Sequence, residues 1–270
     1  MENMNLKFGA LLLVGLLFVA IVPFADAGIR DQNKAARAKY AAAKSDFAKM
    51  KNEYTKARQD YLNAKKQFGN KDKATLESAR TFILKADKAT IAHLETVKSF
   101  VEADWSLDQS QKDKITSALD KDISWLEGKQ SEIETADRAG LIAIGKDIKS
   151  YWSNVKVDLK KYIGEILNAR ASWVLGEADK ADGIIVKNIQ RASDAGKDTT
   201  SLNAFLDDFR SKKDLAQAQY DKAKSSFSSI SSLKDADKLF KEGNSFIKQG
   251  NSYVREAYGD LRSINSELRG

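Results

Sequence analysis

Five basic side chains recur at intervals of seven residues near the start of the chain. They are Arg37, Lys44, Lys51, Arg58 and Lys65. On an α-helix, residues seven apart lie on nearly the same edge, about 10.5 Å from one another along the axis. Such a row can bind an extended polyanion through a series of ionic contacts. The alternative is an ordinary charged flank of a packed helix, either paired with carboxylates or solvated.

Phe246 and Tyr253 are a second candidate contact. Each ring follows a Gly-Asn-Ser tripeptide, which begins at Gly243 in one case and at Gly250 in the other. If exposed, the two rings and their neighbouring amides would resemble a sugar-binding ladder. If buried, they would pack beside a close helix crossing. The heptad spacing favours packing, with another backbone crossing at the two glycines.

The sequence offers little material for a catalytic or metal site. His93 is the only histidine and falls among apolar residues, so a core position is the favoured interpretation. The chain has no Cys, which excludes disulfides and Cys-ligated metals. Phosphate-binding glycine loops, Ca²⁺-binding loops and nucleophilic serine elbows are absent from the sequence, as are specific nucleic-acid-binding motifs. We therefore expect no enzymatic activity, no cofactor and no metal.

Residues 1–27 have the features of an export signal. Lys7 precedes an apolar run over residues 8–22, Pro23 follows it, and Ala25-Asp26-Ala27 has the small-x-small form that signal peptidase accepts. The run is shorter than the roughly 20 apolar residues that span a membrane. We expect cleavage after Ala27 and export to the periplasm, cell surface or extracellular space. The alternative is an uncleaved segment that anchors the protein in the membrane.

The chain that remains after cleavage is basic. Residues 1–27 hold one of the 45 Lys and Arg residues and two of the 38 Asp and Glu residues, so residues 28–270 carry a net charge of +8. This balance favours acidic partners such as anionic glycans, lipid head groups or nucleic acid.

The basic row belongs to the first of several long predicted helices. From Gly28 to Phe68 large rings alternate with Ala or Met at 3-4 spacing, and neither Pro nor Gly occurs after the first residue. This pattern predicts one continuous helix with an apolar seam. The seam has its rings at a positions and its small residues at d positions, and the basic row follows its e flank.

Similar spacing predicts further helices over residues 73–105, 107–137, 141–192, 200–230 and 233–268. The wide apolar face of the second predicts that it is more central than the first. Ser106 and Gln109 form a candidate capping box for the third, and Thr199 or Thr200 a candidate cap for the fifth. Heptad phase is lost after Trp173, which suggests a bend near residues 176–183, where Gly176 and Gly183 lie.

The predicted fold is all-α, an elongated bundle of five or six long, mostly antiparallel helices with coiled-coil-like heptad seams. We expect residues 28–270 to form a single domain. This architecture favours an exported, non-catalytic protein with a structural or interaction role in the cell envelope or extracellular space. Its partner would be an anionic envelope polymer, bound weakly, or another envelope protein. The alternative is a carrier or chaperone-like module that holds lipid or unfolded chains along its apolar seams.

The export signal makes one direct prediction. If signal peptidase cleaves after Ala27, the secreted protein begins at Gly28. N-terminal sequencing of the exported protein checks this, and a sequence that starts at Met1 would instead support the membrane anchor.

Overall fold

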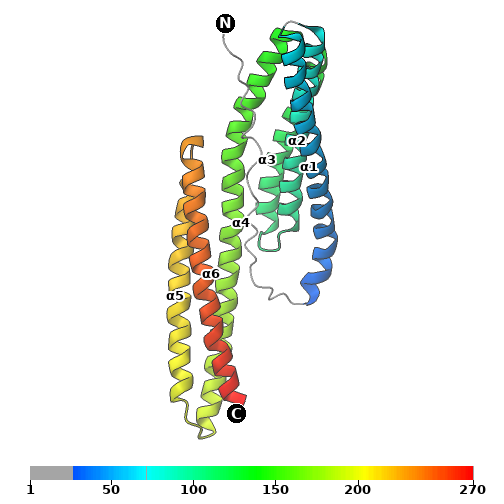
Figure 1. Ribbon diagram of the computed structural model, residues 1–270. Helices are drawn as coiled ribbons and strands as arrows, with labels where there is room; N and C mark the ends of the chain where they lie inside the picture. Colours follow the sequence, from blue (N-terminus) through cyan, green and yellow to red (C-terminus); the bar gives the residue numbers. More distant parts are fainter. Residues whose placement is uncertain (1–26, 71, 270) are drawn as a thin grey trace.

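The computed structural model describes residues 27–70 and 72–269, with side chains from residue 34 onward. These residues form six α-helices and no strand (Figure 1). The helices are α1 (Ala27–Phe68), α2 (Lys73–Ala103), α3 (Gln109–Thr135), α4 (Arg138–Asp194), α5 (Thr200–Ser228) and α6 (Leu233–Arg269). The all-α helical bundle is therefore confirmed. The expected export segment lies outside the described residues, except for Ala27.

The longest helix, α4, is the axis of the molecule. Its 57 residues correspond to a length of about 85 Å at 1.5 Å per residue. Successive helices run in opposite directions, and α1, α2 and α3 lie along the N-terminal half of α4 while α5 and α6 lie along its C-terminal half (Figure 1). In the described part of the chain, α2, α3, α5 and α6 make backbone contacts with α4, whereas none of the helices α1–α3 contacts α5 or α6. The protein is thus two helical bundles that share one helix.

Two buried stripes on α4 explain this sharing. Val155 and Leu159 belong to the core formed with α1–α3, whereas Val157 belongs to the core formed with α5 and α6. Residues two apart on a helix point about 200° apart, so the middle of α4 is buried on opposite faces. The loss of heptad phase therefore marks a change of packing partner. The helix runs without a break through Gly176 and Gly183, and a bend there stays a prediction.

In the N-terminal bundle α2 is central, as its wide apolar face predicts. It contacts α1, α3 and α4, while α1 contacts only α2 among the described helices. The seam of α1 is formed by rings: Tyr54 and Tyr61 stack on Phe82 of α2 at centroid distances of 5.6 and 5.7 Å. Phe68, predicted to end this seam, is instead 51% exposed, because α2 begins beyond it.

The turn between α2 and α3 corrects the predicted capping box. Asp108, rather than Ser106, caps α3: its carboxylate accepts from the Gln111 backbone N–H, and the Gln111 side chain accepts from the Asp108 N–H. Ser106 instead donates to the buried Asp104 carboxylate, which also pairs with Arg170 of α4. This ion pair fastens the turn to α4.

The start of α5 departs from the prediction in the same way. Thr199 occupies the N-cap position, but its side chain makes no capping hydrogen bond. The Asp198 carboxylate accepts from the Thr200 backbone N–H instead, at 2.9 Å. In both turns an aspartate, which accepts hydrogen bonds more strongly as an anion, takes the place predicted for a hydroxyl.

The C-terminal bundle is built on aromatic rings of α5 that lie against glycines. Phe227 lies between Gly164 of α4 and Gly243 of α6, where a Cβ atom would come within 2.6 and 2.5 Å of its side chain. Tyr220 covers Gly250 in the same way and donates its hydroxyl to Asn251 at 2.7 Å. The two glycines therefore mark a close contact of α6 with a neighbouring helix, as predicted, and the nearest atoms belong to rings of α5. Buried rings fill the space that the missing side chains leave.

Gly243→Ala should destabilise the protein, because the new methyl group overlaps a ring that Gly164 confines on its other side. Gly183→Ala is the matched control, since nothing lies within 4 Å of the added Cβ. The control should stabilise by about 0.5–1 kcal/mol through helix propensity alone. Urea unfolding of both variants measures the two signs. A stabilising Gly243→Ala would contradict this account of the packing.

Candidate functional site

The predicted basic row lies along one edge of α1. Arg37, Lys44 and Lys51 are exposed, and Arg58 and Lys65 are half-buried. The edge borders the seam that packs on α2, so the row follows one side of the contact between the two helices. The structure therefore aligns the five residues without gathering them into a pocket.

The two flanks of the α1 seam differ in their ion pairs. On the opposite flank, Lys39 pairs with Glu102, and Glu53 accepts from Lys85 at 2.6 Å. Arg37, Lys51, Arg58 and Lys65 of the basic row make no ion pair with any side chain that the structure describes. The interpretation of the row as a flank neutralised by neighbouring carboxylates therefore fails for these four residues.

The positive charge of the chain is concentrated on α1. Residues 34–68 contain ten Lys or Arg residues and three Asp or Glu residues. This surplus of seven equals the formal net charge of the whole chain, +7. The field of this helix is therefore strongly positive, whereas the charges of the remaining chain nearly cancel.

The aromatic pair lies on α6 and faces the core. Phe246 and Tyr253 are half-buried and pack against the cluster formed by α4, α5 and α6. Lys222 of α5 lies 5.9 Å from the centre of the Phe246 ring. The rings therefore occupy packing positions, and a role in sugar binding stays a prediction.

His93 is a core residue, as its position in the sequence predicts. Its ring lies 5.0 Å from that of Phe47 and 5.9 Å from that of Trp152, and only 7% of the residue is exposed. This burial lowers the pKa of His93 to about 4, because the apolar surroundings disfavour the charged imidazolium. The imidazole is therefore neutral at ordinary pH, and its Nδ1 has no hydrogen-bond partner among the described residues.

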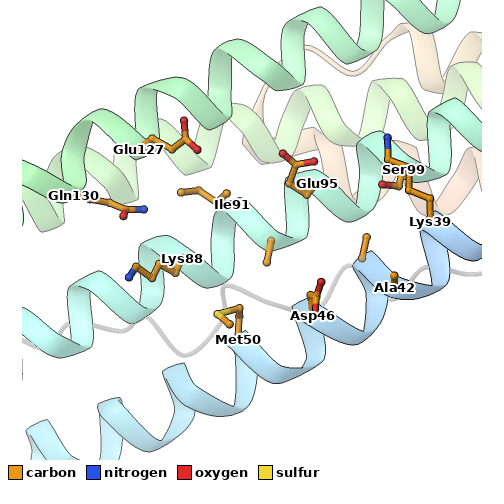
Figure 2. A pocket seen from close by; sticks show the side chains of 12 residues that line it. Lys39, Ala42, Asp46, Met50, Lys88, Ile91, Glu95, Ser99, Glu127 and Gln130 are labelled. Atoms are coloured by element: carbon orange, nitrogen blue, oxygen red, sulfur yellow. The ribbon is translucent and has the colours of Figure 1, made fainter.

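A groove of about 540 Å³ lies between α1, α2 and α3 (Figure 2). Its apolar surface comes from aliphatic side chains and a methionine, among them Ala42, Met50 and Ile91. Charged side chains of both signs surround this surface: Lys39, Asp46, Lys88, Glu95 and Glu127. The mixture of signs distinguishes the groove from the basic row, and the helical spacing of α1 did not reveal it.

A buried carboxylate lies beside this groove. Asp87 of α2 accepts one hydrogen bond from Gln130 at 3.0 Å, and its other oxygen has no partner in the described structure. Burial raises the pKa of Asp87 to about 7. The negative charge of Glu127 acts in the same direction, whereas Gln130 and Lys88 oppose the shift. The sequence signal was its place four residues after buried Ile83, on the core-facing side of α2.

Other features bear on the class of site. Among the described residues, no group of three or more His, Cys, Asp or Glu side chains is arranged to hold a metal ion. None of the described helices contains a stretch both long and apolar enough to cross a membrane. Comparison of the chain with protein-family models, curated proteins and solved structures gave no match. The basic edge of α1 is therefore the candidate site with the clearest chemistry.

The raised pKa of Asp87 predicts a specific pH dependence. Between about pH 4 and 7 the folded protein holds a proton that the unfolded chain releases, so this group lowers stability as the pH rises. Asp87→Asn cannot titrate and should gain stability relative to the wild type across this window. The gain is at most about 4 kcal/mol, since the pKa lies about three pH units above its ordinary value. Urea unfolding of both proteins at several pH values measures the difference.

The contribution of His93 cancels in this comparison, because both proteins contain it. Its lowered pKa acts in the opposite direction and makes the protein less stable as the pH falls from about 6.5 to 4. A stability difference between Asp87→Asn and wild type that is the same at all pH values would show that Asp87 is ionised in the folded protein.

Proposed function

We propose that this is an exported, non-catalytic protein that attaches to an anionic polymer of the cell envelope or extracellular space. The contact is the basic edge of α1. The observation that supports this proposal is the absence of ion pairs at Arg37, Lys51, Arg58 and Lys65 within the described structure. These charges stay available to an outside partner, while Lys39 on the opposite flank is engaged internally.

The shape of the edge suits an extended ligand. Its five residues, from Arg37 to Lys65, fall about 10.5 Å apart along roughly 42 Å of helix. Each ionic contact with a densely charged polymer displaces a condensed counterion, so binding is driven largely by ion release. A linear polymer can make all of these contacts at once, whereas a small anion can make only one or two.

The groove offers the carrier alternative little support. A lipid tail or an unfolded chain needs a continuous apolar lining, but here Asp46, Glu95 and Lys88 surround the alanine, isoleucine and methionine side chains. Each of these charges would lose hydration against an apolar ligand. The non-catalytic assignment is supported in turn by His93, whose neutral ring is enclosed by Phe47 and Trp152.

The test is binding to polygalacturonate, a linear polymer of uronate residues, measured as a function of salt. With five contacts, affinity should fall by roughly a hundredfold between about 50 and 200 mM salt. Reversing Lys51, Arg58 and Lys65 to Glu should lower the amount of polymer bound at the lower salt concentration, and should lower it by more than the matched control does. Circular dichroism verifies that the variant keeps its helical content.

The matched control reverses Lys121, Lys187 and Arg191, which are exposed and make no ion pair in the described part of the chain. This control changes the net charge by the same amount. Its binding therefore distinguishes an effect of the α1 edge from an effect of the overall charge. Basic residues of α5 are unsuitable, because Arg210 and Lys213 pair with Asp182 and Asp179. Equal losses in the two variants, or wild-type binding that ignores salt, would refute the proposal.

A further inference from the structure

A second basic row runs along α6. Six basic residues recur there at intervals of seven: Lys234, Lys241, Lys248, Arg255, Arg262 and Arg269. All six are exposed, and they extend over about 52 Å of helix. This row is longer than the one on α1, and none of its members is half-buried.

Uncharged residues separate successive basic residues over most of this row. On a helix the surface neighbours of a residue are those three and four positions away. From Lys241 to Arg262, the neighbours that follow at these distances are all uncharged: Asn244, Ser245, Asn251, Ser252, Tyr258, Gly259, Asn265 and Ser266. Ser245, Gly259, Asn265 and Ser266 are exposed, and the exposed carboxylates of Glu242 and Glu256 lie at positions directly after Lys241 and Arg255.

The row also lacks internal partners. None of its six residues makes an ion pair with a described side chain. Lys241 helps to lower the pKa of Asp237, whose carboxylate is bound to Lys160 of α4. In contrast, Lys212 on the adjacent helix α5 is held by Asp208 and Asp260. The α6 row is therefore open along its whole length.

The two rows belong to different bundles. Helix α1 packs on α2, and α6 packs on α5 and α4. The axis α4 separates them, with α1 and α6 on different sides of it (Figure 1). The two rows therefore lie on helices that make no contact with each other in the described structure.

We propose that α6 is a second polyanion-binding track and that one molecule of the protein cross-links two linear anionic polymers. This inference rests on the proposed function for α1, which supplies the other track. Uronate chains and polyphosphate share the chemistry that both rows recognise, namely closely spaced negative charges on an extended chain. Each track alone confers attachment, and only the two together confer bridging.

The experiment captures a fluorescent polygalacturonate onto beads that carry immobilised polygalacturonate, with the full-length mature protein as the only bridge. A parallel series uses inorganic polyphosphate on beads and in solution. Beads loaded with the wild-type protein should retain the labelled polymer. An excess of unlabelled free polymer should release the label, because it then occupies the tracks that held the labelled chains. The variant Lys248→Glu, Arg255→Glu, Arg262→Glu should still bind the beads, but it should capture at least about tenfold less label than the wild type does.

The variants separate this inference from the proposed function. The reversal of Lys51, Arg58 and Lys65 should likewise bind and fail to bridge, while the reversal of Lys121, Lys187 and Arg191 should bridge like the wild type. If the α6 variant captures as much label as the wild type, cross-linking through α6 is overturned and attachment through α1 stands. If the α1 variant binds and bridges unchanged, the proposed function fails instead. Bridging of one polymer series but not the other would assign the tracks to that chemistry.

Discussion

The structure depends on the burial of α4 on two opposite faces between about residues 155 and 167. One face of this segment closes the core of α1–α3 through Val155 and Leu159, and the other receives α5 and α6 through Val157. Gly164 lies within it and leaves room for the Phe227 ring. A helix with apolar residues on two opposite faces is stable only when both faces are covered. Each bundle therefore covers one of the two apolar faces of α4.

Much of this fold could be predicted because helical spacing is a local signal. The seam residues of α3, such as Ile115 and Leu126, and those of α5, such as Phe209, are buried as predicted. Features that depend on a distant partner could not be predicted in this way. The glycines of α6 indicated close packing, but only the folded chain shows that the rings of Phe227 and Tyr220 fill the space.

The candidate sites differ in the same respect. The α1 row stands out in the sequence because it flanks a regular aromatic seam, and the α6 row was missed because its seam is interrupted by Gly, Asn and Ser. Within the described structure, Arg37, Lys51, Arg58, Lys65 and the six residues of the α6 row make no ion pair, and this depends on which helices lie within reach. Asp87 is similar: its hydrogen-bond partner, Gln130, is 43 residues away, so its sequence neighbours cannot reveal its raised pKa.

The shared helix α4 also has a consequence for the order in which the two bundles fold. A chain is synthesised from its N-terminus, and elements with local contacts fold as they emerge. The first bundle has all of its helices once the first half of α4 exists, but α4 then exposes Val157, Leu167 and Ala171 to water until α5 and α6 arrive. An intermediate with this apolar strip uncovered can associate with other chains. Docking of the α5–α6 hairpin covers this strip of α4 and so prevents that association.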